Sequence, residues 1–329
     1  MKKNEKDVII NKKQTEVIIL KTLELIVPCF NEGNVLELFF NEVSPVLNRL
    51  SDYDYRYIFV NDGSTDKTLA VLKSLAKKDS RVKYVSLSRN FGKEAAMLAG
   101  LSRSSADYVG IIDADLQHSP ELIPQMLTAI TEEGYDVAAA KRSDRNGESK
   151  FKSFLSDSFY KISNAVSDVK IDQGAQDFRI MNRKVVEAIL SMPEYGRFTK
   201  GIFSYVGFKT KWFTHENRER AAGETKWSVQ KLFKYALDGI LSFSSAPLKI
   251  PACVGIVLFI IGIIEGLILF FVGCSSKYAM FTSHTTNCLI MIVGGLVLLC
   301  LGIIGEYIAR IYNEVKGRPV YIINESNFD

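Results

Sequence analysis

Residues 108–117 read Tyr-Val-Gly-Ile-Ile-Asp-Ala-Asp-Leu-Gln, an apolar run that ends in two aspartates one residue apart. The run predicts a buried strand, Tyr108–Asp113, and because strand side chains alternate, Asp113 and Asp115 are expected on one face at its end. Adjacent carboxylates repel each other and resist burial unless a cation holds them. An ordinary turn after a strand is the alternative. The pair favours Mg²⁺ or Mn²⁺ bound together with a diphosphate, because Mg²⁺ takes about one or two protein carboxylates and completes its shell with phosphate oxygens and water.

Residues 22–140 extend outward from this strand as an alternation of strands and helices. Segments rich in Val, Ile and Tyr predict strands at Leu23–Pro28, Tyr55–Val60, Val82–Leu87, Tyr108–Asp113 and Asp136–Ala140. Helices are predicted between them at Val35–Leu50, Lys67–Lys78, Lys93–Ser102 and Pro120–Glu133, the last with Ser119 as its N-cap. This order predicts an α/β fold with a mostly parallel sheet covered on both faces, whose ligands bind at the carboxyl ends of the strands.

The loops after the first, second and fourth strands carry polar side chains that are expected to converge at one edge of the sheet. They span 28–32, 61–66 and 113–117. Neither Gly-x-Gly-x-x-Gly nor Gly-x4-Gly-Lys-Ser/Thr follows the first strand, which argues against a dinucleotide-binding fold and a P-loop. Binding of a nucleotide is then left to acidic groups, and Glu32 and Asp62 suit its base and ribose hydroxyls. His118 shows no ligand spacing and is expected at the surface.

Two long apolar stretches near the C-terminus, 250–272 and 288–308, each approach the ~20 residues that cross a bilayer. Buried core helices are the alternative, but the stretches are joined only by a short polar loop, 273–287. By the positive-inside rule both flanks face the cytoplasm, which predicts a multi-pass protein of the inner (plasma) membrane with a cytoplasmic catalytic domain. The flanking charges are Lys231, Lys234 and Lys249 before the pair and Arg310, Lys316 and Arg318 after it, whereas the loop has only Lys277.

The rest of the chain divides around these two regions. We expect a charged N-terminal arm (1–21) without signal-peptide features, a catalytic domain (22–226), an amphipathic juxtamembrane helix (227–248), two transmembrane helices (249–310) and a cytoplasmic C-terminal tail (311–329). Within the catalytic domain, 150–166 predicts a basic amphipathic helix at the membrane interface, with a core-facing surface helix as the alternative. The net charge of +4 gives no indication of a nucleic-acid partner.

Motifs along the chain resemble those of family 2 glycosyltransferases with the GT-A fold. They are Val27–Glu32, Asn61–Asp66, Arg89–Glu94, Asp113–Gln117, Gln176–Arg179 and Arg220–Lys226. The branch that the chain resembles most is the polyisoprenyl-phosphate glycosyltransferases, which include dolichol-phosphate mannose synthases and bactoprenol glucosyltransferases. The resemblance covers about 22–323. Asn61 departs from the Asp-Asp of many members, which leaves Asp62 as the expected ribose or base contact.

The resemblance implies a GT-A (Rossmann-like) catalytic domain followed by amphipathic interfacial helices and two transmembrane helices. It implies an inverting transferase that moves one sugar, from UDP-glucose or a UDP-N-acetylhexosamine, to polyprenyl (undecaprenyl) phosphate for cell-envelope glycosylation. Metal ligands are expected at Asp113, Asp115 and Gln117 for Mg²⁺ or Mn²⁺. Donor-binding residues are expected at Pro28, Asn31, Glu32, Asp62, Lys93, Asp113, Ala114, Asp115, Gln117, Arg220 and Lys226.

Catalytic roles are expected for Asp177, Asp115 and Arg179. Asp177 matches the family's candidate base, but a phosphate monoester has a second pKa of about 6 and is largely its own nucleophile, so an orienting role stays open. The acceptor phosphate is expected at the basic segment of Lys141, Arg142 and Arg145, with Arg142 favoured.

Two alternatives and the oligomeric state remain open from the sequence. A processive membrane polysaccharide synthase usually carries Gln-x-x-Arg-Trp and more spans, and this chain shows neither feature. A non-catalytic scaffold is disfavoured by the intact acidic motif. A homo-oligomer is compatible with the paired spans.

Overall fold

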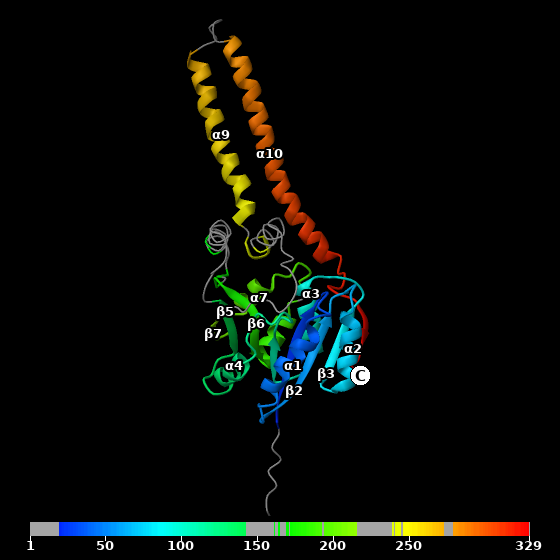
Figure 1. Cartoon of the computed structure of the whole chain (residues 1–329). Helices are drawn as coiled ribbons and strands as arrows, with labels where there is room; N and C mark the ends of the chain where they lie inside the picture. Colours follow the sequence, from blue (N-terminus) through cyan, green and yellow to red (C-terminus); the bar gives the residue numbers. More distant parts are fainter. Residues whose placement is uncertain are drawn as a thin grey trace, which may run out of the picture.

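The structure, a computed structural model, describes residues 20–142, 161, 164, 169–170, 172–192, 194–215, 239, 241–244, 246–272 and 279–328. Within these residues an 8-stranded sheet runs in the order β7-β5-β6-β4-β1-β2-β3-β8. The strands are β1 (Lys21–Cys29), β2 (Tyr53–Asn61), β3 (Val82–Leu87), β4 (Tyr108–Ile111), β5 (Val137–Arg142), β6 (Ala175–Asn182), β7 (Thr210–His215) and β8 (Ile323–Ser326) (Figure 1).

The sheet is mostly parallel, as predicted. β1 pairs in parallel with β2 and β4, β2 pairs in parallel with β3, and β5 pairs in parallel with β7. β6 runs antiparallel to both β4 and β5, and β8 runs antiparallel to β3. Because β6 is antiparallel to β4, with Arg179 opposite Ile111, the beginning of β6 lies at the same edge as the carboxyl end of β4. This antiparallel pairing brings β6, which is distant from β4 in the sequence, to the edge of the sheet where ligands are predicted to bind.

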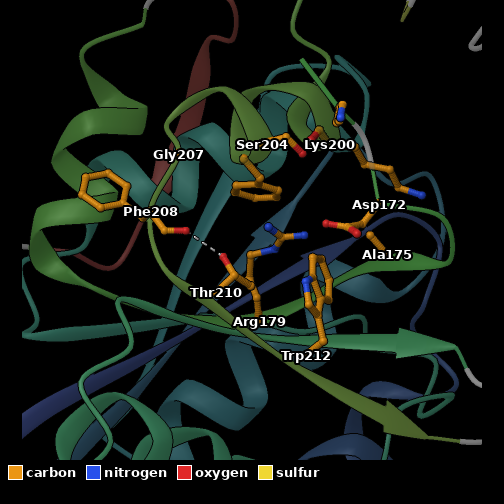
Figure 2. A pocket seen from close by; sticks show the side chains of 11 residues that line it. Asp172, Ala175, Arg179, Lys200, Ser204, Gly207, Phe208, Thr210 and Trp212 are labelled. Carbon is orange, nitrogen blue, oxygen red and sulfur yellow. Dashed lines mark hydrogen bonds between the residues drawn. The ribbon is translucent and has the colours of Figure 1, made fainter. Parts of the chain in front are cut away.

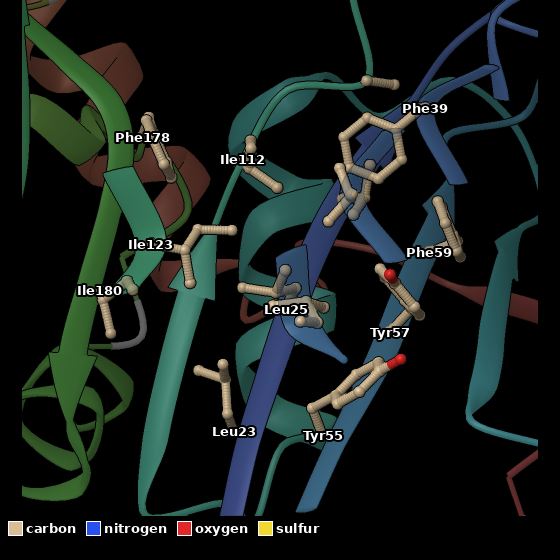
Figure 3. Packing of buried hydrophobic residues seen from close by; sticks show 14 of the residues in the cluster. Leu23, Leu25, Phe39, Tyr55, Tyr57, Phe59, Ile112, Ile123, Phe178 and Ile180 are labelled. Carbon is tan, nitrogen blue, oxygen red and sulfur yellow. The ribbon is translucent and has the colours of Figure 1, made fainter. Parts of the chain in front are cut away.

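Helices cover both faces of the sheet and enclose two apolar layers. One layer lies between the strands and α1 (Leu36–Leu47), α2 (Thr68–Lys78) and α4 (Leu122–Thr131), and the other involves α3 (Lys93–Arg103), α6 (Arg183–Leu190) and α7 (Thr199–Tyr205). Figure 3 shows the first layer, in which the stacked rings of Tyr57 and Phe59 have centroids 5.6 Å apart. Burial of each such side chain contributes about 1.5–3 kcal/mol, so this layer fixes where the strands end and their loops begin.

The strands and helices predicted over 22–140 are all present, and their ends differ by at most three residues. One local correction concerns α4, which begins at Leu122 and not at Pro120. The N–H of Leu122 donates to the carbonyl of Ser119 (3.2 Å) and that of Ile123 to Pro120 (2.9 Å). Ser119 therefore opens a turn through its backbone instead of capping the helix with its side chain.

Two long helices follow the sheet domain. In Figure 1, α9 (Ala246–Val272) and α10 (Ala279–Val315) run alongside each other away from the sheet. They contain the stretches Ala246–Ile264 and Leu289–Val315, which are long and apolar enough to cross a membrane. The Tyr307 hydroxyl of α10 donates to the carbonyl of Ser244 (2.6 Å), which ties the helix to the segment before α9.

The C-terminal segment is not a simple tail. α10 continues to Val315, and β8 then returns to the sheet edge beside β3. Lys73 Nζ lies 2.7 Å from Glu325 Oε1, and the backbone N–H of Tyr84 donates to the Asn327 side chain. β8 thereby covers the edge of β3. Because β8 has only four residues, its sequence periodicity did not reveal this strand. The predicted arm up to residue 19 and most of the predicted helices at 150–166 and 227–248 lie outside the described residues.

Candidate active site

A lysine between two carboxylates forms the centre of the site. Lys93 Nζ, from the first turn of α3, lies 2.7 Å from Asp113 Oδ1 and 2.5 Å from Asp177 Oδ2. Asp113 follows β4, whereas Asp177 lies on β6, so the antiparallel placement of β6 creates the cluster. Sequence reasoning named all three residues, but it did not place Lys93 between the two acids.

The charges of this cluster stabilise one another. Burial by itself raises the pKa of Asp177, but the positive charges of Lys93 and then Lys200 outweigh it and hold the pKa below its usual range. For Lys93, burial lowers the pKa and the charges of Asp113 and Asp177 more than reverse this, so its pKa is raised. Asp177 is therefore ionised at neutral pH and is a weak proton acceptor.

The loop after β4 presents oxygen ligands suited to a divalent cation. Leu116 has a φ of 57°, a left-handed conformation that is uncommon for a residue with a branched side chain. The turn lets the N–H of Gln117 donate to Asp115 Oδ1 (3.2 Å). Among the described residues no group of three or more His, Cys, Asp or Glu side chains gathers to hold a metal. Asp113, Asp115 and Gln117 stay the predicted ligands of Mg²⁺ or Mn²⁺, which complete their shells with phosphate and water oxygens.

His118 is not at the surface as expected, because its side chain is 5% exposed. Its ring lies 5.3 Å from that of Phe178, and its Nε2 lies 4.0 Å from Asp113 Oδ2. Burial lowers the pKa of His118, against the opposing charge of Asp113. The imidazole is therefore neutral at pH 7 and packs behind the acidic loop.

The loops after β1 and β2 are joined by hydrogen bonds. Asn31, with a φ of 55°, accepts from the N–H of Thr65 at its side-chain oxygen (2.9 Å). The N–H of Glu32 donates to Thr68 Oγ1 (2.9 Å), and that of Gly33 donates to Asp66 (3.1 Å). Asn31 thus supports the loop pair, while Pro28 is the second-last residue of β1 and half-buried Glu32 stands at the turn. Contact of these residues with a donor stays a prediction.

Asp62 is buried and holds the turn that precedes α3. Its two carboxylate oxygens accept from the N–H groups of Phe91 (2.7 Å) and Gly92 (2.9 Å). Burial raises the pKa of Asp62, although these two hydrogen bonds oppose the rise. Because Lys93 directly follows this turn, Asp62 positions the central lysine. The sequence predicted a ribose or base contact for Asp62 and did not predict this positioning role.

Arg179 supports Asp177 through the backbone. Its guanidinium donates to the carbonyl oxygens of Gln176 (2.8 Å) and Asp177 (3.3 Å) and lies 3.4 Å from the centre of the Phe203 ring. Burial lowers the pKa of Arg179 to about 10, against the charges of Asp177 and Glu94. Arg179 therefore fixes the β6 backbone beside the carboxylate of Asp177.

Sequence reasoning missed two charged residues beside this cluster. Glu94 accepts from the N–H of Thr199 (3.0 Å) and so joins α3 to α7. Burial and the charge of Asp177 raise the pKa of Glu94 to about 7. Lys200, on α7, contributes positive charge at Asp177. No local pattern links residues so far apart in the chain, so only the fold reveals them.

The predicted basic segment begins at the end of β5. The Lys141 ammonium lies 5.8 Å from the centre of the Trp212 ring, and the backbone N–H of Arg142 donates to the carbonyl of Gly174 (3.1 Å). Ala114 is buried in the turn between the two aspartates. Arg145, Arg220 and Lys226 lie outside the described residues.

Comparison with known proteins covers both parts of the chain. Residues 24–190 match the family described as Glycosyl transferase family 2, and residues 246–311 match the GtrB C-terminal hairpin. The putative glycosyltransferase CsbB of Bacillus subtilis (strain 168) is 41% identical over 93% of this chain and 92% of its own length. The prophage bactoprenol glucosyl transferase homolog of Escherichia coli (strain K12) is 40% identical over 92% of this chain and 98% of its own. The similarity thus spans the sheet domain and the helical pair.

Proposed function

The chain belongs to glycosyl transferase family 2, and we propose that it moves one sugar from a nucleotide-sugar donor to a polyprenyl phosphate with inversion at the sugar carbon. Similar proteins from Escherichia coli and Shigella flexneri are named bactoprenol glucosyl transferases, which supports undecaprenyl phosphate as the acceptor. The observation that carries the proposal is the cluster of Lys93, Asp113 and Asp177 at the carboxyl edge of the sheet. UDP-glucose and UDP-N-acetylhexosamines are the donors to test first.

The donor diphosphate is proposed to lie over the loop after β4. Mg²⁺ or Mn²⁺ held by Asp113, Asp115 and Gln117 would supply positive charge for the leaving nucleoside diphosphate. Lys93 adds a second positive charge at Asp113, and Arg220 and Lys226 are proposed to approach the same diphosphate. Glu32 and Asp62 complete the proposed donor site, with Asp62 acting through the turn before Lys93.

The acceptor phosphate supplies the nucleophile. With a second pKa of about 6, it is largely a dianion near pH 7 and needs no base. Its oxygen forms a bond with the anomeric carbon as the bond from that carbon to the diphosphate breaks, and the electron pair leaves on the diphosphate. Because its pKa is lowered and it is paired with Lys93, Asp177 orients the reactants instead of taking a proton.

The two apolar helices support a reaction at a membrane surface, because they are long and apolar enough to cross a membrane. We propose that they cross the inner (plasma) membrane with both flanks cytoplasmic, so that the product enters cell-envelope glycosylation. In a cysteine-free background, Ser283→Cys should react with an impermeant thiol reagent on intact cells. Asn324→Cys, at an exposed position of β8, should not. The opposite labelling pattern would refute a cytosolic donor.

Transfer itself is tested with the purified protein in detergent. A panel of UDP- and GDP-sugars is mixed with undecaprenyl phosphate, and the lipid fraction is analysed by mass spectrometry. The expected product carries one sugar joined through a phosphodiester. A ladder of sugars on one lipid would instead support the processive synthase, and transfer to a free oligosaccharide would refute the lipid acceptor.

A further inference from the structure

A cavity of about 200 Å³ lies between α7 and strands β6 and β7. Figure 2 shows Arg179 in the middle of this cavity, between Trp212 of β7 and Ser204 of α7. Phe203 adds aromatic surface, Phe208 lies with its ring away from Arg179, and Lys200 lines the cavity from α7 (Figure 2). Among the described residues, none of the predicted donor loops 28–32, 61–66 and 113–117 lines the cavity, which distinguishes it from the diphosphate position proposed above.

The charge of the cavity favours an anion. Lys170, Arg179 and Lys200 line it together with a single acid, Asp172. Among the residues that the structure describes, the half-buried Lys200 ammonium has no hydrogen bond or ion pair, and no acid pairs with the Arg179 guanidinium, which donates only to backbone carbonyls. The charge of Asp177 acts on both of these cations, and a bound anion would add a direct contact for these partly buried groups.

The cavity adjoins the centre of the candidate active site. Asp177 and Arg179 are two residues apart on β6, so their side chains share one face of the sheet. Lys200 lies close enough to Asp177 to contribute to its lowered pKa. An anion bound at Lys200 would therefore lie next to the carboxylate that contacts Lys93.

The register of β5 and β7 brings one residue of the predicted basic segment to this face. Ala139 pairs with Trp212, and Lys141 lies two residues further along β5 with its ammonium 5.8 Å from the Trp212 ring centre. Strand alternation puts Arg142 on the opposite face. Lys141, and not Arg142 as we favoured from the sequence, is thus the basic residue next to the cavity.

We propose that this cavity binds the phosphate of the acceptor lipid, with Lys200 and Lys141 as its cations and the first isoprene units against Trp212 and Phe203. This inference rests on the proposed function and adds to it the position at which the acceptor phosphate binds. An anion with an apolar chain matches both halves of the lining, whereas inorganic phosphate matches only the charged half.

Binding can be measured without turnover, because the chain has only two tryptophans, Trp212 and Trp227. In a Trp227→Phe variant in detergent, the emission of Trp212 is titrated with farnesyl phosphate, farnesol, inorganic phosphate and UDP. Farnesyl phosphate should give a saturable change, and farnesol should bind about tenfold or more weakly, since it lacks the charged contact. Equal binding of farnesol would overturn the proposal, as would tighter binding of inorganic phosphate or UDP.

Lys200→Gln in this background should weaken farnesyl phosphate binding about tenfold or more, while Lys200→Arg, which keeps the charge, should weaken it less. Lys209→Gln is the matched control, because Lys209 is exposed and lies over Tyr135. Thermal unfolding of each variant checks the fold. Unchanged binding in Lys200→Gln would refute the site.

Kinetics separate this inference from the proposed function. In the transfer assay, Lys200→Gln should raise the acceptor KM more than the donor KM. If lipid product forms but the acceptor KM is unchanged, the inference is wrong and the function stands. If no donor yields product although the titrations behave as expected, the proposed function is wrong and the lipid-phosphate site stands.

Discussion

The two halves of the catalytic edge are held together by different means. In the donor half, defined as the loops 28–33, 61–68 and 113–117, neighbouring loops bond directly to one another, as Asn31 does to Thr65. The acceptor half is defined as β6, α7 and β7 around the cavity. Contacts between residues far apart in the sequence join this half to the donor half. Lys93 contacts Asp177, and Glu94 accepts from Thr199.

This difference assigns distinct roles to similar side chains. A carboxylate in the donor half, such as Asp62, mostly fixes a turn, and its loss should affect folding and donor binding. Lys93 and Glu94, which both begin α3, set the distance between the halves. Substitutions there should affect turnover or pH dependence while the separate halves remain folded.

The largest effect is expected from the acidic loop of the donor half. Asp115→Asn should lower turnover by at least ~10²-fold, because one major stabiliser of the leaving diphosphate is weakened. EDTA should lower turnover similarly, and added Mg²⁺ or Mn²⁺ should restore it. Sugar transfer to lipid is the measurement. Full activity in EDTA or in the variant would show that no metal acts at this loop.

Removal of the cation that joins the halves should come next. Lys93→Ala leaves Asp113 and Asp177 facing each other without the shared positive charge, and turnover should fall about tenfold or more. Lys73→Ala is the control, since Lys73 pairs with Glu325 at the β8 edge. Equal turnover in the two variants would mean that the central ion pairs do not connect the halves.

Asp62→Asn tests the turn of the donor half. One carboxylate oxygen becomes an NH₂ group, which leaves the buried N–H of Phe91 or Gly92 without an acceptor and costs about 1–3 kcal/mol. Denaturant unfolding should show this loss, and the donor KM should rise. Asp107→Asn is the control: at this exposed position a single carboxylate oxygen accepts both bonds from Thr22, and the substitution should leave the donor KM unchanged. A raised donor KM in both variants would contradict a specific role for Asp62.

The smallest effect concerns the contact between α3 and α7. The pKa of Glu94 is raised from its model-compound value of 4.5 to about 7, so the folded state holds this proton more tightly than the unfolded chain. Its contribution to stability is present below pH ~4.5 and is lost as the pH rises through about 7. Glu94→Gln should remove this part of the pH dependence and make Tm flatter by a few degrees between pH 5 and 8. An unchanged Tm curve would refute the assignment.

Local sequence patterns determined the parallel core and the candidate chemistry of the donor half. The segments Val27–Cys29, Ile58–Asn61 and Ile111–Asp113 each combine an apolar strand with polar residues at its carboxyl end. Because the carboxyl ends of parallel strands meet at one edge of a sheet, these ends are expected to lie together. The helical pair was equally readable, because apolar length is a local property. The prediction of these two helices needed no knowledge of the order of the strands in the sheet.

Only the tertiary structure decided which elements far apart in the sequence lie side by side. The antiparallel placement of β6 between β4 and β5, the return of β8 to β3 and the position of Lys93 between two acids depend on contacts between distant residues. The burial of His118 could not be predicted from the sequence either, since a histidine beside a loop is buried or exposed according to what packs over it. Hydrophobic periodicity specifies which residues face a core, but the free energy that selects strand neighbours and charge partners comes from packing across the whole domain.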